Sequence, residues 1–167
     1  MLEAAAGLFS PQSAIRDHPE SRRNWHLMGW QAPFFERRRD MQHKILIVDD
    51  SKLARMVMVS AFRRIRPEWE LVEATNADEA LAAVSAGSVD IALVDFNMPG
   101  TDGLEVVAKI RQLHPAMPVA VVSANVQDEI IARARELNAA FVAKPLTDEA
   151  LGAFLSGAVL RLRKSVQ

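Results

Sequence analysis

Residues 90–95, DIALVD, form a short apolar run that ends on an aspartate. Four similar runs lie along the chain: KILIVD at 44–49, WELVEA at 69–74, PVAVVS at 118–123 and AFVAK at 140–144. Three of the five are almost continuously apolar rather than alternating, as expected of strands that are covered on both faces. The runs therefore predict a parallel sheet whose strands are buried.

Helical stretches separate these runs, at about residues 52–66, 77–86, 103–113, 126–137 and 148–163. Pro67, Gly87 and Pro115 mark the ends of the first three. Thr147 is placed to cap the last helix. Strict alternation of strands and helices with short links predicts an α/β fold, with a doubly wound five-stranded parallel sheet and helices on both faces.

Composition excludes several classes of protein. The 167 residues include no cysteine, which rules out disulfides, thiolate metal sites and a cysteine nucleophile. Lys and Arg number 20 against 21 Asp and Glu, a balance that argues against binding to nucleic acid. No apolar run approaches the roughly 20 residues of a membrane span, and the start lacks the positive charge of a signal peptide. We therefore expect a cytoplasmic protein without stable membrane insertion.

The composition changes at about residue 41. Residues 1–40 contain three prolines, two of the three tryptophans and arginine clusters at 22–23 and 37–39, without a sustained apolar period. We interpret this segment as an N-terminal extension, either a mobile tail or the result of a start site assigned too early; a docking peptide or membrane-surface segment is the alternative. Residues 41–167 form the predicted domain.

Polar side chains follow the predicted strands. The first run ends on Asp49 and Asp50, the third on Asp95, the fourth on Ser123 and the fifth on Lys144. Ligands of open α/β sheets bind at this edge. Three converging carboxylates repel one another unless a cation lies among them, and Mg²⁺ prefers such oxygen ligands. An aspartate can also form an acyl phosphate, so the residues indicate phosphoryl transfer.

Four motifs carry a resemblance to a known family: ILIVDDS (45–51), LVDFNMPGTDGLE (93–105), VVSAN (121–125) and FVAKPL (141–146). In their order and spacing, residues 42–164 resemble the receiver domain of bacterial two-component response regulators, of the kind found in the single-domain chemotaxis regulator. The resemblance implies a flavodoxin-like strand order, 2-1-3-4-5, in which the first strand lies between the second and the third.

The resemblance also implies roles at the acidic edge. Asp95 matches the aspartate that accepts the phosphoryl group. Asp49 and Asp50 match the acidic pair that holds Mg²⁺ with Asp95, and Asn97 matches the position whose backbone carbonyl completes the metal site. Lys144 matches the lysine that pairs with the phosphoryl group and precedes a peptide bond that is usually cis.

Two further positions match the conformational switch of the family. Ser123 matches the switch hydroxyl, and Phe141 matches the switch aromatic. The asparagines Asn97 and Asn125 lie beside the phosphorylation site, where side chains tune the lifetime of the phosphoryl group.

The implied function is that of a single-domain response regulator. A histidine kinase or phosphotransfer protein phosphorylates Asp95, and a conformational switch changes the binding of a downstream target protein at the surface of residues 126–137, the fifth strand and the last helix. The chain would catalyse only its own phosphorylation and dephosphorylation, so it is not otherwise an enzyme, and it would be a monomer or weak dimer. Because the sequence ends just after the last helix, we expect no DNA-binding output domain.

Two alternatives remain. A haloacid-dehalogenase-type phosphatase also uses an aspartyl nucleophile, Mg²⁺, a hydroxyl and a lysine, but Asn97 stands where that family has its acid and the acidic pair comes first. A receiver fold that binds partners without phosphorylation is the other alternative, and the complete set of site residues argues against it.

Overall fold

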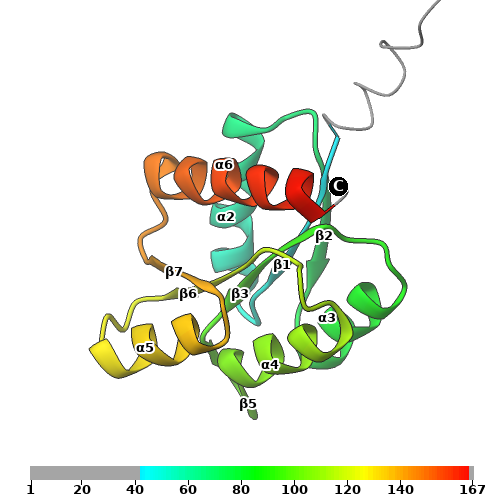
Figure 1. Cartoon of the computed structure of the whole chain (residues 1–167). Helices are drawn as coiled ribbons and strands as arrows, with labels where there is room; N and C mark the ends of the chain where they lie inside the picture. The colour runs from blue at the N-terminus through cyan, green and yellow to red at the C-terminus, as the bar shows by residue number, and fades with distance from the viewer. Residues whose placement is uncertain (1–41, 166–167) are drawn as a thin grey trace, which may run out of the picture. The chain divides into compact units, whose positions relative to one another are not determined.

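The computed structural model describes residues 42–165, so the predicted extension at 1–40 lies outside the described residues. In chain order the elements are β1 (Lys44–Val48), α2 (Lys52–Ile65), β2 (Glu70–Ala74), α3 (Ala77–Ser85), β3 (Ile91–Asp95), β4 (Asn97–Met98), β5 (Thr101–Asp102), α4 (Gly103–Leu113), β6 (Val119–Ser123), α5 (Asp128–Glu136), β7 (Ala140–Ala143) and α6 (Asp148–Ser165) (Figure 1).

The main sheet has five parallel strands in the order β2-β1-β3-β6-β7. The short strands β4 and β5 pair only with each other, in an antiparallel hairpin. Among the strands of the main sheet the order is therefore 2-1-3-4-5, which confirms the prediction. The central strands β3 and β6 are buried at every residue, as their continuous apolar runs predict.

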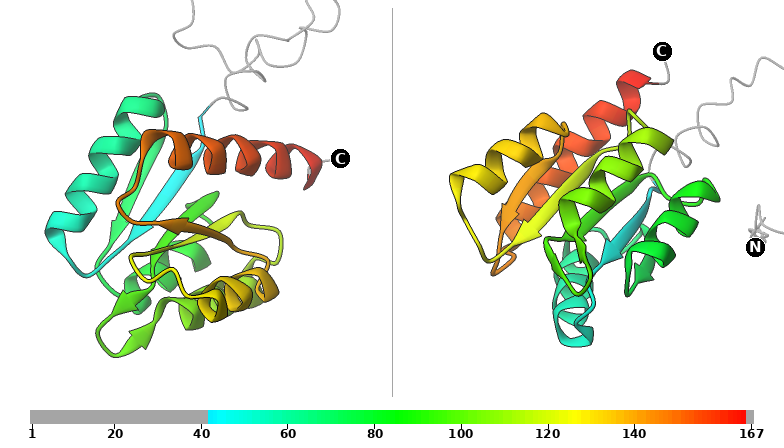
Figure 2. Two further views of the ribbon diagram at one scale, coloured as in Figure 1. Left: turned by 90° about the vertical axis from the view of Figure 1, so that its left-hand side faces the viewer. Right: turned by 90° about the horizontal axis from the view of Figure 1, so that it is seen from below.

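Helices cover both faces of the sheet, so the doubly wound arrangement is also confirmed. Figure 1 and the rotated views in Figure 2 show α2 and α6 on one face and α3, α4 and α5 on the other. Alternate residues of each strand enter the two cores. Ile45 and Ile47 pack with Phe62 of α2 and Leu155 of α6. Leu46 and Val48 pack in the core that includes residues of α3, α4 and α5.

Side-chain caps fix where the helices begin relative to the strand ends. The Ser51 Oγ accepts a hydrogen bond from the Ala54 N–H at 3.3 Å, directly after the acidic pair. The Asp102 carboxylate accepts one from the Leu104 N–H at 2.8 Å and starts α4. Thr147 caps α6 through the Ala150 N–H at 3.1 Å, as predicted. Because such caps satisfy otherwise unpaired N–H groups, they hold the loops that follow the strands in one conformation.

The structure corrects some predicted boundaries. The helix predicted at 126–137 spans Asp128–Glu136, and Gln127 makes no side-chain capping bond at its start. The residues after Asp95, to which the sequence assigns no strand or helix, form the β4–β5 hairpin, with Gly100 at a φ of 78°. The second strand begins at Glu70, so Trp69 lies outside it, although Trp69 is buried beside Phe62. Within residues 42–165, no helix combines the length and apolar character needed to cross a membrane.

Candidate functional site

Three carboxylates meet at the carboxyl edge of the sheet. β1 and β3 are paired with Val48 opposite Val94, so Asp49 and Asp95 follow on neighbouring strands. One carboxylate oxygen from each of Asp49, Asp50 and Asp95 lies within 4.8 Å of the others. Asp49 and Asp95 are buried, at 1% and 3% exposure, whereas Asp50 faces solvent. The structure therefore brings together the acidic residues that the sequence places at this edge.

Lys144 joins this cluster from the loop after β7. Its Nζ lies 2.6 Å from Asp95 Oδ1 and 3.0 Å from Asp49 Oδ2. The Lys144 backbone N–H donates to the Ser123 carbonyl oxygen at 2.8 Å, and the peptide bond to Pro145 is cis, as expected. One ammonium thus bridges two buried carboxylates that come from different strands.

This cluster has more acidic than basic groups, and the pKa values of Asp95 and Lys144 reflect it. Burial raises the pKa of the Asp95 carboxyl, and the negative charge of Asp49 adds to the rise, while Lys144 opposes it. For Lys144, burial disfavours the ammonium, yet its bonds and charge interactions with Asp95 and Asp49 keep its pKa above the ordinary lysine value. Three carboxylates face a single ammonium, so the donor set and its excess negative charge fit a hard divalent cation such as Mg²⁺.

The remaining predicted residues lie around this cluster rather than in it. Ser123 is fully buried and follows Val122, the partner of Asp95 on β6. Its Oγ accepts a hydrogen bond from the Asn125 N–H at 3.0 Å. Asn97 starts the β4–β5 hairpin and is exposed, and its backbone amide opposes the rise in the pKa of the Asp95 carboxyl. Phe141 lies farther back on β7, where it is partly buried against the core beneath α4 and α5.

Two supporting residues were not foreseen from the sequence. The Arg55 guanidinium donates from Nη1 to the Asp49 carbonyl oxygen at 2.7 Å and pairs with Glu73 through Nε at 3.2 Å. Arg55 therefore links the backbone at Asp49 to Glu73 of β2. Gly103 begins α4 against the end of β3, where a Cβ would lie 2.1 Å from the Asp95 carbonyl oxygen. The Asp-Gly pair at 102–103 was the available signal for a close backbone approach.

Comparisons with known families and proteins point the same way. The sequence model for the response regulator receiver domain matches residues 45–156. The cyclic di-GMP phosphodiesterase response regulator RpfG of Xanthomonas campestris pv. campestris is 33% identical over 128 residues, covering 75% of this chain and 34% of RpfG. The transcriptional regulatory protein LytR of Staphylococcus aureus is 35% identical over 103 residues, covering 61% of this chain and 41% of LytR. The chain thus spans about a third to two fifths of the length of these curated relatives.

Solved receiver domains share the fold. A CheY-like response regulator receiver domain protein from Methanospirillum hungatei superposes with a TM-score of 0.66 at 25% identity, covering 74% of this chain and 98% of the other. The chemotaxis protein CheY4 of Vibrio cholerae gives a TM-score of 0.63 at 25% identity, covering 70% and 98%. With the family match across most of the folded residues and the acidic edge in place, the chain belongs to the response regulator receiver domain family.

Proposed function

We propose that this chain is a phosphorylation-controlled receiver that accepts a phosphoryl group on Asp95 from a histidine kinase or phosphotransfer protein. The observation that carries the proposal is Lys144, whose ammonium lies between the buried carboxylates of Asp95 and Asp49 at 2.6 and 3.0 Å. An ammonium at this place faces the oxygen that would receive the phosphoryl group. It would then pair with the added negative charge rather than with the free carboxylate.

The chemistry follows from this arrangement. A carboxylate oxygen of Asp95 attacks the phosphorus atom of a phosphohistidine, forming the O–P bond as the P–N bond breaks, and the departing imidazole takes up a proton. Asp49, Asp50 and Asp95, with the backbone carbonyl of Asn97, are the groups that would hold Mg²⁺. When bound, the ion neutralises charge on the transferred phosphoryl group.

The output is proposed to be a change in protein binding. The Ser123 hydroxyl on β6 would turn toward the phosphoryl group, and Phe141, which is only partly buried, would move further into the core. A shift between two pre-existing conformations would then alter the surface of α5, β7 and α6, where a target protein is proposed to bind. The phosphatase alternative is not favoured, because Asn97 has no carboxyl to act as the acid.

The direct test is phosphorylation of the purified full chain by acetyl phosphate. With MgCl₂ we expect intact-mass spectrometry to show the addition of one phosphoryl group, removed by hydroxylamine as an acyl phosphate should be. Excess EDTA should prevent the addition, because the carboxylates then lack their counter-ion. A chain that gains no phosphoryl group with Mg²⁺ would favour the phosphorylation-independent adaptor, and steady turnover of a phosphomonoester would favour the phosphatase.

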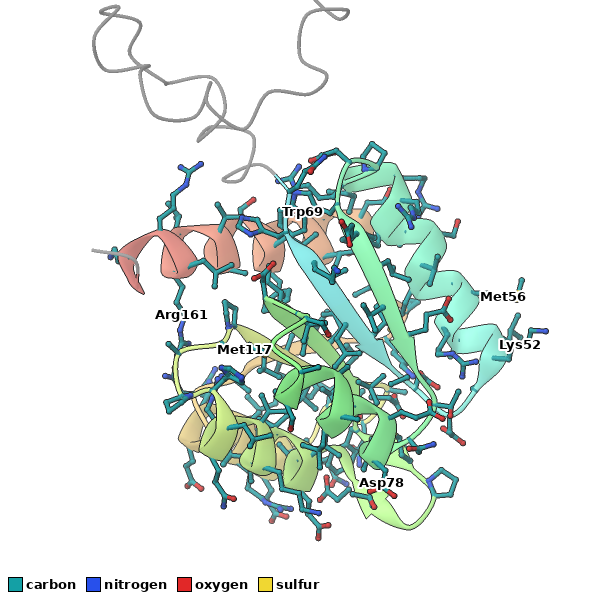
Figure 3. The ribbon with its side chains drawn as sticks, turned by 90° about the vertical axis from the view of Figure 1, so that its right-hand side faces the viewer. Lys52, Met56, Trp69, Asp78, Met117 and Arg161 are labelled. Atoms are coloured by element: carbon teal, nitrogen blue, oxygen red, sulfur yellow. The ribbon has the colours of Figure 1, made fainter. Side chains whose placement is uncertain are left out.

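An apolar patch beside the site suggests where the phosphodonor protein docks. Leu53, Met56 and Val57 lie on the first turns of α2 and are 72%, 58% and 54% exposed. α2 begins two residues after Asp50, and Figure 3 shows Met56 pointing away from the sheet. Exposed apolar side chains clustered beside a functional site favour a protein contact. We propose that the donor packs on this patch while its phosphohistidine reaches Asp95.

Replacing this patch should slow transfer from a protein donor but not from a small molecule. For Leu53→Ser with Met56→Ser, we expect the rate of transfer from a phosphorylated histidine phosphotransfer domain that labels the wild-type chain to fall by about tenfold. Radiolabel transfer measures this rate, and labelling by acetyl phosphate should stay unchanged. Leu160→Ser is the matched control, because Leu160 is 60% exposed on α6. Equal loss in the control would rule out the α2 patch as the donor contact.

A further inference from the structure

An open cavity lies at the amino ends of the strands, away from the acidic cluster. Its volume is about 390 Å³, which is within the roughly 300–1,000 Å³ typical of small-ligand cavities. It lies where the start of β7 meets the end of α5 and one face of α6. Much of its lining is apolar and small, contributed by Val119, Ala139, Ala140, Ala153, Phe154 and Gly157. A Cβ at Gly157 would meet nothing within 4 Å, so the cavity is open at this point.

Two arginines line this cavity, and none of the lining residues that the structure describes is acidic. The two are Arg135 of α5 and Arg161 of α6. Within residues 42–164, neither arginine has a carboxylate oxygen within 4.0 Å. Neither has an acidic residue three or four positions away on its own helix, where an ion pair would form. The lining therefore presents two guanidinium groups without a counter-ion from the described part of the chain.

The hydrogen bonds of these arginines leave donors available. Among the described residues, Arg161 donates from Nη1 to the Asn138 carbonyl oxygen at 3.4 Å and to Asn138 Oδ1 at 3.2 Å. Figure 3 shows its side chain extending from α6. A third arginine, Arg111, donates a hydrogen bond from Nη2 to the same Asn138 carbonyl oxygen at 2.7 Å. Burial lowers the pKa of Arg111, and the positive charge of Arg161 lowers it further. Two positive charges thus lie close together at Asn138. Because a guanidinium has five N–H donors, Arg161 has donors left for a bound ligand.

We propose that this cavity binds a small organic anion, a carboxylate carried on a flat apolar body. Arg135 and Arg161 would take the carboxylate through charge-assisted hydrogen bonds. Phe154 would pack against the apolar body, in the space left open by Ala153 and Gly157. The cavity is remote from Asp95, although it lies on the surface of α5, β7 and α6 where the target protein is proposed to bind. Binding of the anion requires no phosphorylation, so this proposal and phosphorylation of Asp95 can fail separately.

Binding of benzoate tests the proposal, and benzamide, which is uncharged, serves as the control compound. In ¹H–¹⁵N spectra of the full chain without Mg²⁺, benzoate should cause saturable shifts at the amides of Asn138, Ala140 and Gly157 while leaving Ser123 in place. Benzamide has the same ring but no charge, so it should bind at least about tenfold more weakly. No saturable shift with benzoate, or equal binding of both compounds, would overturn the proposal.

Variants then assign the charge to the two arginines. Arg135→Gln with Arg161→Gln should weaken benzoate binding by about tenfold or more, since it removes both charged donors. Arg163→Gln is the matched control, because Arg163 lies on the same helix but does not line the cavity, and it should bind as the wild type does. Unchanged binding in the double variant would contradict the assignment. If the double variant does not fold, the comparison of benzoate and benzamide on the wild-type chain decides alone.

Discussion

Asp95→Asn is expected to abolish phosphorylation by acetyl phosphate, reducing the labelled fraction to background under conditions that label the wild type nearly completely. The amide keeps the size of the carboxyl, and its oxygen can still accept the bond from Lys144, which lies 2.6 Å from Asp95 Oδ1. It removes the anionic oxygen that must attack phosphorus. Intact-mass spectrometry after incubation with Mg²⁺ measures the effect.

The loss should come from chemistry rather than unfolding. Asp95 is buried beside Asp49, and burial together with that neighbour's charge raises the pKa of Asp95, so its negative charge is not needed for stability. The melting temperature of the variant should therefore match or exceed that of the wild type. Asp90→Asn, in the turn before the same strand, is the control and should be labelled normally. Full labelling of Asp95→Asn would show that another residue accepts the phosphoryl group.

Gly103→Ala is expected to destabilise the fold by about 1–3 kcal/mol and to slow phosphorylation. Its Cβ would lie 2.1 Å from the Asp95 carbonyl oxygen and 2.8 Å from Phe96 Cα, both backbone atoms. The start of α4 would have to move away from the end of β3, and the 3.0 Å bond from the Gly103 N–H to the Phe96 carbonyl oxygen would weaken. Urea unfolding measures the free-energy change.

Gly152→Ala supplies the contrast for this prediction. Gly152 lies inside α6, and a Cβ there would meet nothing within 4 Å. Alanine loses less backbone freedom than glycine when a helix forms, so this variant should be more stable than the wild type by about 0.5–1 kcal/mol. If Gly103→Ala were as stable as the wild type, the start of α4 could move away from β3 without lowering the free energy of unfolding, and the prediction would be wrong.

The acidic edge was predictable because parallel strands end at one edge of the sheet. Once the apolar runs were recognised, the residues that follow them, Asp49, Asp95, Ser123 and Lys144, had to lie near that edge. The strand order came from the resemblance to the receiver family rather than from the apolar pattern, because the pattern alone does not select which strands pair. The structure confirms that order.

Other features depend on packing that one segment of sequence does not show. The β4–β5 hairpin has only two residues in each strand, too few for a period to be read. The contact at Gly103 exists only because α4 starts against the end of β3. The arginine-lined cavity combines Arg135 and Arg161 from two helices, whose approach is set by the tertiary fold.

Features of the two outer strands of the sheet, β2 and β7, oppose aggregation of the folded protein. An outer strand presents unpaired backbone groups that can pair with another molecule. β7, at one side, has only four residues, which gives an incoming strand little to pair with. β2, at the other side, carries the exposed side chains of Glu70 and Glu73, which pair with Lys44 and Arg55. Short length on one side and charged side chains on the other thus both oppose sheet extension between molecules.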